Sequence, residues 1–199
     1  MGYHRAGFDV WGVDIVPQPN YPFLFIQDDA IDFVRKFGSM FDAIHASPPC
    51  QSSSALTKGT NKGREYTDLI PSTREAISGY YVPTVIENVQ GADIRRDLTL
   101  CGEYFGLGVI RHRYFELTEF HVPQPEHIKH RGRVAGYRHG KWYDGPYFAV
   151  YGDGGGKGSV AQWQQAMDMD WTVVRKELAE AIPPAYTEYI GKFMIGNLT

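Results

Sequence analysis

The stretch FDAIHASPPCQ, residues 41–51, decides the fold that the sequence predicts. Its first part, 41–47, is short and rich in apolar residues, which is typical of a buried strand. Pro48 and Pro49 stiffen the turn that follows, so Cys50 is presented at the end of the strand. A cysteine at such a place is either a buried core residue or a thiol presented for chemistry, and the rest of the sequence must distinguish the two.

Strands and helices alternate on both sides of this stretch. The apolar pattern predicts strands over 10–15, 23–27 and 84–89 and a helix over 30–38. Ser72 and Glu75 have the spacing of a capping box, which predicts a helix that opens there and ends near Gly79. The alternation predicts an α/β fold, a parallel sheet with helices on both faces. In such sheets the chemistry gathers at the carboxyl ends of the strands.

The alternation weakens beyond about residue 112. The sequence predicts a strand over 111–120 and a strand-like segment over 146–152. The last helix is clearer, because Pro183 and Pro184 open it and a stripe of apolar residues follows at helical spacing.

Composition limits the class of protein. The chain has 199 residues, a net charge of −3 and two cysteines, which suits one α/β domain or one domain with a small lobe. The cysteines make no disulfide framework, and a reducing cytoplasm is the expected location. No apolar run of membrane-spanning length is present, so no membrane partner is expected. Nucleic-acid binding would require a local basic patch.

Two further motifs accompany Cys50. Glu87-Asn88-Val89 ends one predicted strand, and Arg111-x-Arg113 opens a later one. A carboxylic acid and a pair of guanidinium groups can hold a flat heterocycle against a thiolate. The ordered set, with Pro48-Pro49-Cys50-Gln51 first, resembles the DNA (cytosine-5) methyltransferases. The resemblance implies a Rossmann-like sheet that uses S-adenosylmethionine, and the segment 177–191 looks like the last motif of the family.

The resemblance also implies roles for individual residues. Cys50 would add to carbon 6 of a cytosine flipped out of double-stranded DNA, so that carbon 5 can accept the methyl group. Glu87 would hold ring N3 and the exocyclic amine, Arg113 the base carbonyl, and Arg111 would support the site. The implied substrate contacts are Gln51, Ser52, Ser53, Asn88, Lys129, Arg131 and Arg133.

The implied cofactor site is at the ends of the first two strands. Asp14 would bind the ribose of S-adenosylmethionine and Asp29 its adenine amino group, with Pro49 and Ala181 close to the cofactor. Either acid alone is equally well explained as a cap of the following turn or helix.

The domain organisation departs from that of the family. The chain starts after the expected first strand and glycine-rich turn. Either the true start lies upstream of Met1, or the sheet is N-terminally truncated and closes the gap, self-associates or uses a partner chain. The predicted parts are a catalytic core, 1–117, a short recognition region, 118–176, and a returning C-terminal helix, 177–199. A compact, bacteriophage-type enzyme of the bacterial cytoplasm is expected. The alternative is a non-catalytic DNA-binding remnant with an impaired cofactor site.

No metal site is expected. Histidines gather in the basic segment 121–141, but the sequence shows no carboxylate or cysteine at metal-ligand spacing to complete a set. Cys101 has no partner motif and is interpreted as a core residue. The basic segment is interpreted either as a phosphate contact or as an ordinary solvated loop.

Overall fold

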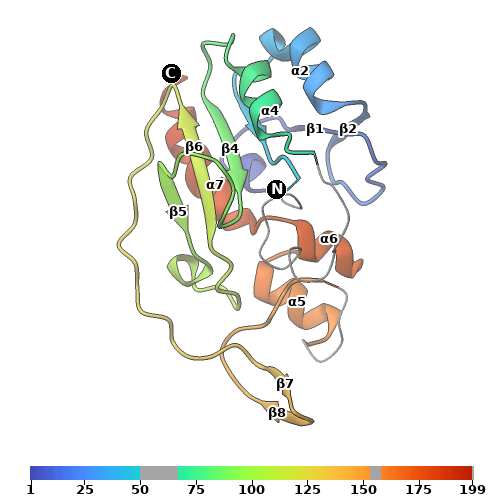
Figure 1. Cartoon of the computed structure of the whole chain (residues 1–199), viewed down its shortest axis with the longest axis vertical. Helices are drawn as coiled ribbons and strands as arrows, with labels where there is room; N and C mark the ends of the chain where they lie inside the picture. Colours follow the sequence, from blue (N-terminus) through green and yellow to red (C-terminus); the bar gives the residue numbers. More distant parts are fainter. Residues whose placement is uncertain (50–66, 153–157, 199) are drawn as a thin grey trace.

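The computed structural model describes residues 1–49, 67–152 and 158–198 (Figure 1). The described strands form three sheets. These are the parallel pair β1 (Trp11–Asp14) and β2 (Leu24–Gln27), a four-stranded sheet in the order β3 (Ile44–Ala46), β4 (Thr84–Asn88), β6 (Arg113–Thr118), β5 (Leu98–Leu100), and the hairpin β7 (Gly136–Arg138) and β8 (Lys141–Tyr143).

The helices confirm much of the predicted pattern and add to it. They are α1 (Gly2–Arg5), α2 (Ala30–Phe37), α4 (Ile70–Ile77), α5 (Val160–Met167), α6 (Arg175–Glu180) and α7 (Pro184–Ile195), with short 3-10 helices η1 (Gly38–Met40) and η3 (Gly102–Phe105). Among the described residues no helix is long and apolar enough to span a bilayer.

The four-stranded sheet is mixed, whereas the sequence predicts a parallel one. β3 and β4 are parallel, but β6 runs antiparallel to both β4 and β5. Residues 101–112 join β5 to β6 and hold the short 3-10 helix η3 but no α-helix, so this connection is not a helical crossover and the chain returns antiparallel. The α/β class is therefore confirmed, and the all-parallel topology is wrong.

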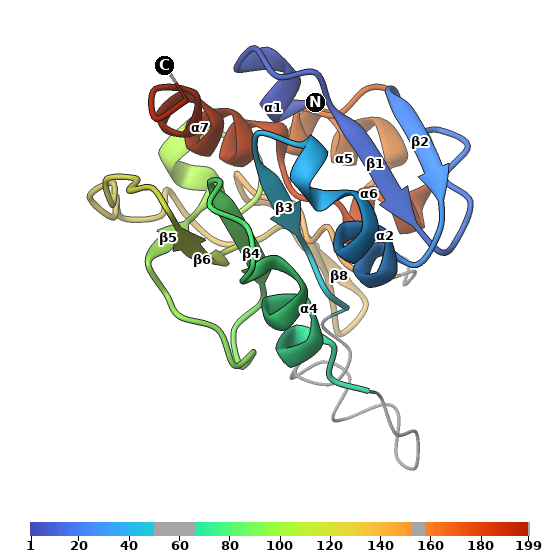
Figure 2. The same ribbon diagram turned by 90° about the horizontal axis from the view of Figure 1, so that it is seen from above.

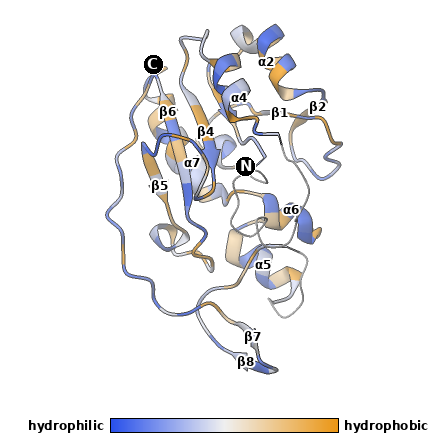
Figure 3. Cartoon of the chain, in the orientation of Figure 1, coloured by the Kyte–Doolittle hydropathy of each residue, from blue (hydrophilic) through white to orange (hydrophobic). Residues whose placement is uncertain are grey.

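Helices cover both faces of this sheet, as predicted (Figure 2). On one face Val85 of β4 belongs to the main core, which also holds Tyr186 and Ile190 of α7. On the other face Ile86 packs with Ile77 of α4 in a smaller cluster. Successive residues of a strand point to opposite faces, so β4 joins the two clusters. In Figure 3 β4 is orange along only part of its length, in keeping with its sequence TVIEN.

The strand pair near the N-terminus is separate from the four-stranded sheet. β1 belongs to the parallel pair and β3 to the four-stranded sheet, and no ladder joins these two strands in the described structure. Side chains connect them instead. The rings of Trp11 and Phe41 meet edge to face with centroids 5.5 Å apart.

Residues from all three predicted parts of the chain share one core. Val150, Trp163 and Met167 are buried in the same cluster as Phe115 and Tyr186. The region 118–176 thus contributes to the interior as well as to the surface. The hairpin of β7 and β8 lies at its far end, away from the sheet (Figure 1).

Two local predictions are wrong. The helix α4 begins at Ile70, before the proposed capping box, because Pro71 suits its first turn and the carboxylate of Asp68 accepts from the Ile70 amide at 3.0 Å. The segment 146–152 forms no strand and contributes only a bridge between Val134 and Tyr147.

Candidate active site

The topology brings two of the predicted motifs to one place. β4 ends at Asn88, and the antiparallel strand β6 begins beside it, with Tyr114 opposite Asn88 in the register. An antiparallel neighbour starts where its partner ends, so Arg113 reaches the carboxyl end of β4. β3 ends at Ala46 on the other side of β4, and the Pro-Pro turn follows it.

Glu87 and Arg113 form a buried ion pair at this edge. The guanidinium Nε of Arg113 lies 2.9 Å from a carboxylate oxygen of Glu87. The side chain of Arg113 is 16% exposed and that of Glu87 is 9% exposed. Burial raises the pKa of Glu87 above its ordinary value, although Arg113, Arg111 and a hydrogen bond with Ser47 act in the opposite direction. A carboxyl group in this environment can hold a proton under conditions in which a surface glutamate is ionised.

Asn88 connects this edge to the Pro-Pro turn. Its amide Nδ2 donates to the carbonyl of Pro48 at 3.0 Å, and its Oδ1 accepts from the Val89 backbone amide at 2.9 Å. The side chain is buried, so neither bond competes with bulk water. The sequence predicts a substrate contact for Asn88, and the structure places it as a residue that positions the segment before Cys50.

A series of hydrogen-bonded polar side chains leads to Ser47, the residue that precedes the Pro48-Pro49 turn. The Tyr3 hydroxyl lies 2.6 Å from Nδ1 of His45, and Nε2 of His45 lies 3.1 Å from the Ser47 hydroxyl. Ser47 in turn hydrogen-bonds Glu87. Burial lowers the pKa of His45 to about 4, so the ring is neutral at physiological pH. The sequence analysis did not identify these three residues, although Ser47 directly precedes the Pro-Pro turn.

Arg111 acts as an internal clamp. Its guanidinium donates to the backbone carbonyls of Val150 at 2.6 Å, Ala179 at 2.5 Å and Ala181 at 2.7 Å. Its backbone has a φ of 38°, a left-handed value that is uncommon outside glycine. The guanidinium of Arg111 thus holds three backbone segments together, and the predicted cofactor residue Ala181 supplies one of the three acceptors.

The two acids proposed for the cofactor lie at the expected strand ends. β1 and β2 are parallel, and Asp14 is opposite Gln27 at their carboxyl edge. Asp14 accepts from the Val16 amide at 2.8 Å and from the Gln18 side chain at 3.1 Å. Asp29 caps α2 by accepting from the Ile31 and Asp32 amides. Capping is therefore observed for Asp29, and each carboxylate retains lone pairs for a further donor.

The basic segment has three different kinds of side-chain environment. Arg131 lies 2.9 Å from the buried carboxylate of Glu103, so its charge is already paired within the chain. Arg133 donates to the Asp144 carbonyl at 2.9 Å, and its guanidinium lies 5.0 Å from the centre of the Tyr143 ring. Lys129 is exposed. Arg131 consequently supports the packing of this segment.

Four predicted residues lie outside the described part of the chain: Cys50, Gln51, Ser52 and Ser53. The turn that leads to them is described as far as Pro49, which is exposed.

The interpretation of the histidines is wrong in one respect. A cysteine does complete a set, because Cys101 lies among His112, His127 and His130. Cys101 is buried, as expected of a core residue, but its thiol lies 3.4 Å from Nε2 of His130. Sequence spacing does not reveal this cluster, because its members come from three separate segments.

Comparison with protein families finds no model that matches this chain, and comparison with curated proteins finds no match. One solved structure that resembles it is a mutant DNMT2 from Spodoptera frugiperda, with 22% sequence identity and a TM-score of 0.39. The superposition covers 57% of this chain and 45% of that one, so this chain matches less than half of the DNMT2 chain. This likeness concerns the backbone arrangement, and the residue assignments depend on this chain's own geometry.

Proposed function

We propose that this protein transfers a methyl group from S-adenosylmethionine to carbon 5 of cytosine in double-stranded DNA. The observation that carries the proposal is the meeting of the Pro48-Pro49 turn, the Glu87-Asn88 strand end and Arg113 at one sheet edge. These segments are far apart in the sequence, and their side chains supply a proton donor and a cation beside the turn that leads to Cys50.

The chemistry follows from what each group can do. The Cys50 thiolate adds to carbon 6 of the base, and the electron pair of the 5,6 double bond becomes available at carbon 5. S-adenosylmethionine, held by Asp14 and Asp29, would supply the methyl group as an electrophile, and its sulfur would leave as the thioether S-adenosylhomocysteine. Transfer of the proton from carbon 5 to solvent water then restores the double bond and expels the thiolate, which regenerates the enzyme.

Glu87 assists the addition step. A protonated carboxyl group can donate to ring N3, which draws electron density from the ring and makes carbon 6 more electrophilic. The raised pKa of Glu87 favours the protonated form that this role requires. Arg113, which is held against Glu87, is proposed to donate to the base carbonyl.

The cofactor and the DNA are assigned to separate surfaces. Asp14 and Asp29 offer carboxylate acceptors for ribose hydroxyls and the adenine amine. Lys129 and Arg133 provide positive charge for phosphates, whereas the charge of Arg131 is paired with Glu103. Gln51, Ser52 and Ser53 are proposed to contact the flipped nucleotide.

Covalent trapping tests the proposal. Duplex DNA that carries 5-fluorocytosine, incubated with protein and cofactor, should give a stable protein–DNA adduct, because fluorine at carbon 5 cannot leave as a proton does. Cys50→Ala should abolish the adduct, whereas Cys101→Ala, the matched change at the chain's other cysteine, should retain it wherever the variant is folded. An adduct that survives Cys50→Ala would refute the assignment. DNA binding without any adduct in the unaltered protein would favour the non-catalytic alternative.

A further inference from the structure

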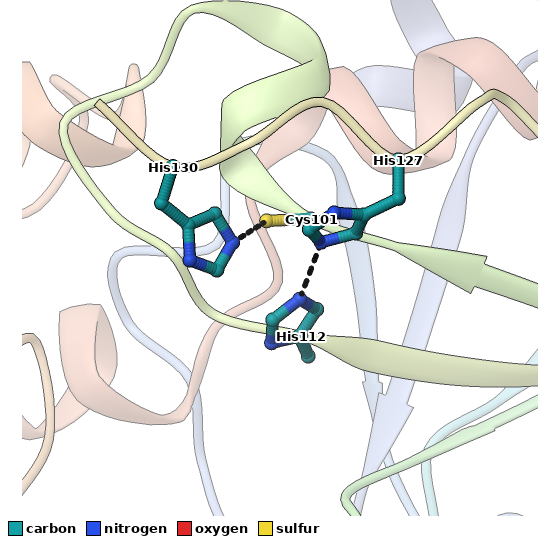
Figure 4. A group of neighbouring side chains, drawn as sticks. All are labelled: Cys101, His112, His127 and His130. Atoms are coloured by element: carbon teal, nitrogen blue, oxygen red, sulfur yellow. Dashed lines mark hydrogen bonds between the residues drawn. The ribbon is translucent and has the colours of Figure 1, made fainter. Parts of the chain in front are cut away.

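Four side chains with metal-binding atoms meet between the end of β5 and the start of β6 (Figure 4). They are Cys101, His112, His127 and His130, here called the CysHis3 cluster, and their ligand atoms all lie within 4.8 Å of one another. We propose that the CysHis3 cluster binds one divalent transition-metal ion, and that Zn²⁺ is the ion it fits best.

The β5–β6 register explains how two of the ligands come together. Leu98, Thr99 and Leu100 pair with Phe115, Tyr114 and Arg113, so Cys101 and His112 are the next residues along the two strands. The bond from the Gly102 amide to the Ile110 carbonyl, 2.8 Å, keeps the two segments together beyond the ladder. Side chains opposed across antiparallel strands lie close together.

The other two ligands come from one turn of the coil that follows β6. His127 and His130 are three residues apart in the sequence HIKH, and Figure 4 shows both rings directed at the Cys101 sulfur and the His112 ring. The Arg131–Glu103 pair and the hydrogen bond from the Arg131 amide to the Tyr147 hydroxyl, 2.8 Å, hold the coil at this place. The ligands are thus positioned by contacts outside the cluster.

The distances suit tetrahedral coordination. With Zn–N bonds of about 2.0–2.1 Å and a Zn–S bond of about 2.3 Å, tetrahedral geometry separates two nitrogens by about 3.3 Å and sulfur from nitrogen by about 3.6 Å. The Nε2 atoms of His112 and His127 are 3.3 Å apart, and the Cys101 sulfur is 3.4 Å from Nε2 of His130. The remaining pairs are within 4.8 Å, so small side-chain rotations complete the set.

The ligand types favour zinc and a structural role. Imidazole nitrogens and one thiolate are borderline to soft donors, which suit Zn²⁺ and exclude Mg²⁺ and Ca²⁺ as preferred ions. Four protein ligands close the coordination sphere and leave no position for substrate, which is typical of structural rather than catalytic zinc.

The bound ion would connect the start of β6, which carries Arg113, to the basic segment. The metal site does not depend on the proposed methyl transfer. His112 lies between Arg111 and Arg113, and its carbonyl accepts from Arg113 Nη1 at 3.0 Å. His127 and His130 flank Lys129 in the basic segment. A metal ion at the cluster therefore fixes the start of β6 and the basic segment relative to each other.

Metal content provides the first test. The 199-residue protein, expressed with zinc in the medium and purified without a histidine tag, should contain about one Zn²⁺ per chain, as a single closed site requires. His127→Ala, a change at an exposed ligand, should remove most of the metal while the near-ultraviolet circular dichroism still shows a folded protein. His121→Ala is the matched control, because His121 is exposed in the same coil and lies outside the cluster. Folded protein without stoichiometric metal, or equal metal in the His127→Ala variant, would overturn the proposal.

Cobalt substitution identifies the thiol. Protein reconstituted with Co²⁺ should show the visible bands of tetrahedral Co²⁺ together with a thiolate-to-cobalt charge-transfer band. The chain has two cysteines, so Cys101→Ala should lose the charge-transfer band and Cys50→Ala should keep it. Retention of the band in Cys101→Ala, or its loss in Cys50→Ala, would contradict the assignment. Cys50→Ala removes the proposed nucleophile, so the metal site and the methyl transfer are tested separately.

Discussion

Replacing Glu87 by glutamine separates catalysis from stability at the candidate active site. The change keeps the shape of the side chain and an oxygen that can accept from Arg113, but it removes the ionisable group. We predict that Glu87→Gln folds normally and loses methyl transfer by about 10²–10⁴-fold, the usual size of general acid–base assistance.

The pH dependence of stability has a definite sign. Burial raises the pKa of Glu87 in the folded state, so the folded protein binds more protons here than the unfolded chain, whose glutamate titrates near about 4.3. The free energy of unfolding of the unaltered protein therefore falls as pH rises through the window between the unfolded and the folded pKa. Each unit of separation corresponds to about 1.4 kcal/mol. Glutamine carries no such dependence, so the variant should gain relative stability across this window.

Alanine at the same position provides the comparison. Glu87→Ala removes the carboxylate that faces the Arg113 guanidinium, whose side chain is only 16% exposed. Loss of one partner of a buried ion pair destabilises by about 3–5 kcal/mol. Glu87→Gln should change the free energy of unfolding much less, by about 1 kcal/mol, because a neutral hydrogen bond can replace the pair.

Urea unfolding of the three proteins at several pH values between 4 and 8, followed by circular dichroism, measures these differences. Two results would show that the carboxylate stabilises the fold in its charged form. The free energy of unfolding could fall as much in Glu87→Gln as in Glu87→Ala, or that of Glu87→Gln could fall relative to the unaltered protein as pH rises. The pKa of Glu87 is then not raised, and the reasoning above fails.

Three further predictions concern other parts of the structure. Arg111→Ala should lower the free energy of unfolding by about 2–4 kcal/mol, because three carbonyls lose charge-assisted donors worth about 1.5–3 kcal/mol each before relaxation; a change within error in urea unfolding would contradict the clamp. Replacing Lys129 and Arg133 by alanine should weaken DNA binding and reduce the slope of log K against log salt by about one per lost phosphate contact, and an unchanged slope would leave the segment as a solvated loop. Calorimetry on the 199-residue chain should find S-adenosylmethionine affinity no tighter than about millimolar, since Asp14 and Asp29 can serve only its nucleoside end; micromolar binding would show that other residues hold the methionine end.

The sequence determined those features that depend on local pattern. Helical spacing and an acid at the cap position predict α2, and Asp29 does accept from two of its first amides. The final helix begins at Pro184 as predicted, because proline suits the first turn of a helix. Strands β1 to β4 follow from their apolar runs. The hairpin of β7 and β8 was missed, although the two-residue turn His139-Gly140 has the positive φ angles that such turns require.

Tertiary structure decided how these elements are arranged and what their side chains do. The antiparallel direction of β6 brings Arg113 to Glu87, and only the folded chain shows that burial raises the pKa of that carboxyl group. The side chain of Asn88 bonds the Pro48 backbone carbonyl, and the side chain of Arg131 pairs with Glu103. No local sequence pattern predicts either contact.

The CysHis3 cluster shows most clearly the difference between what local sequence pattern predicts and what the tertiary structure decides. Its members are spread over residues 101–130, in a β-strand end, a strand start and a coil, so their sequence spacing matches no metal-binding motif. The sequence shows the residue types but not their proximity. Contacts between residues far apart in the chain depend on strand register and on packing of the coil, and these are properties of the whole fold.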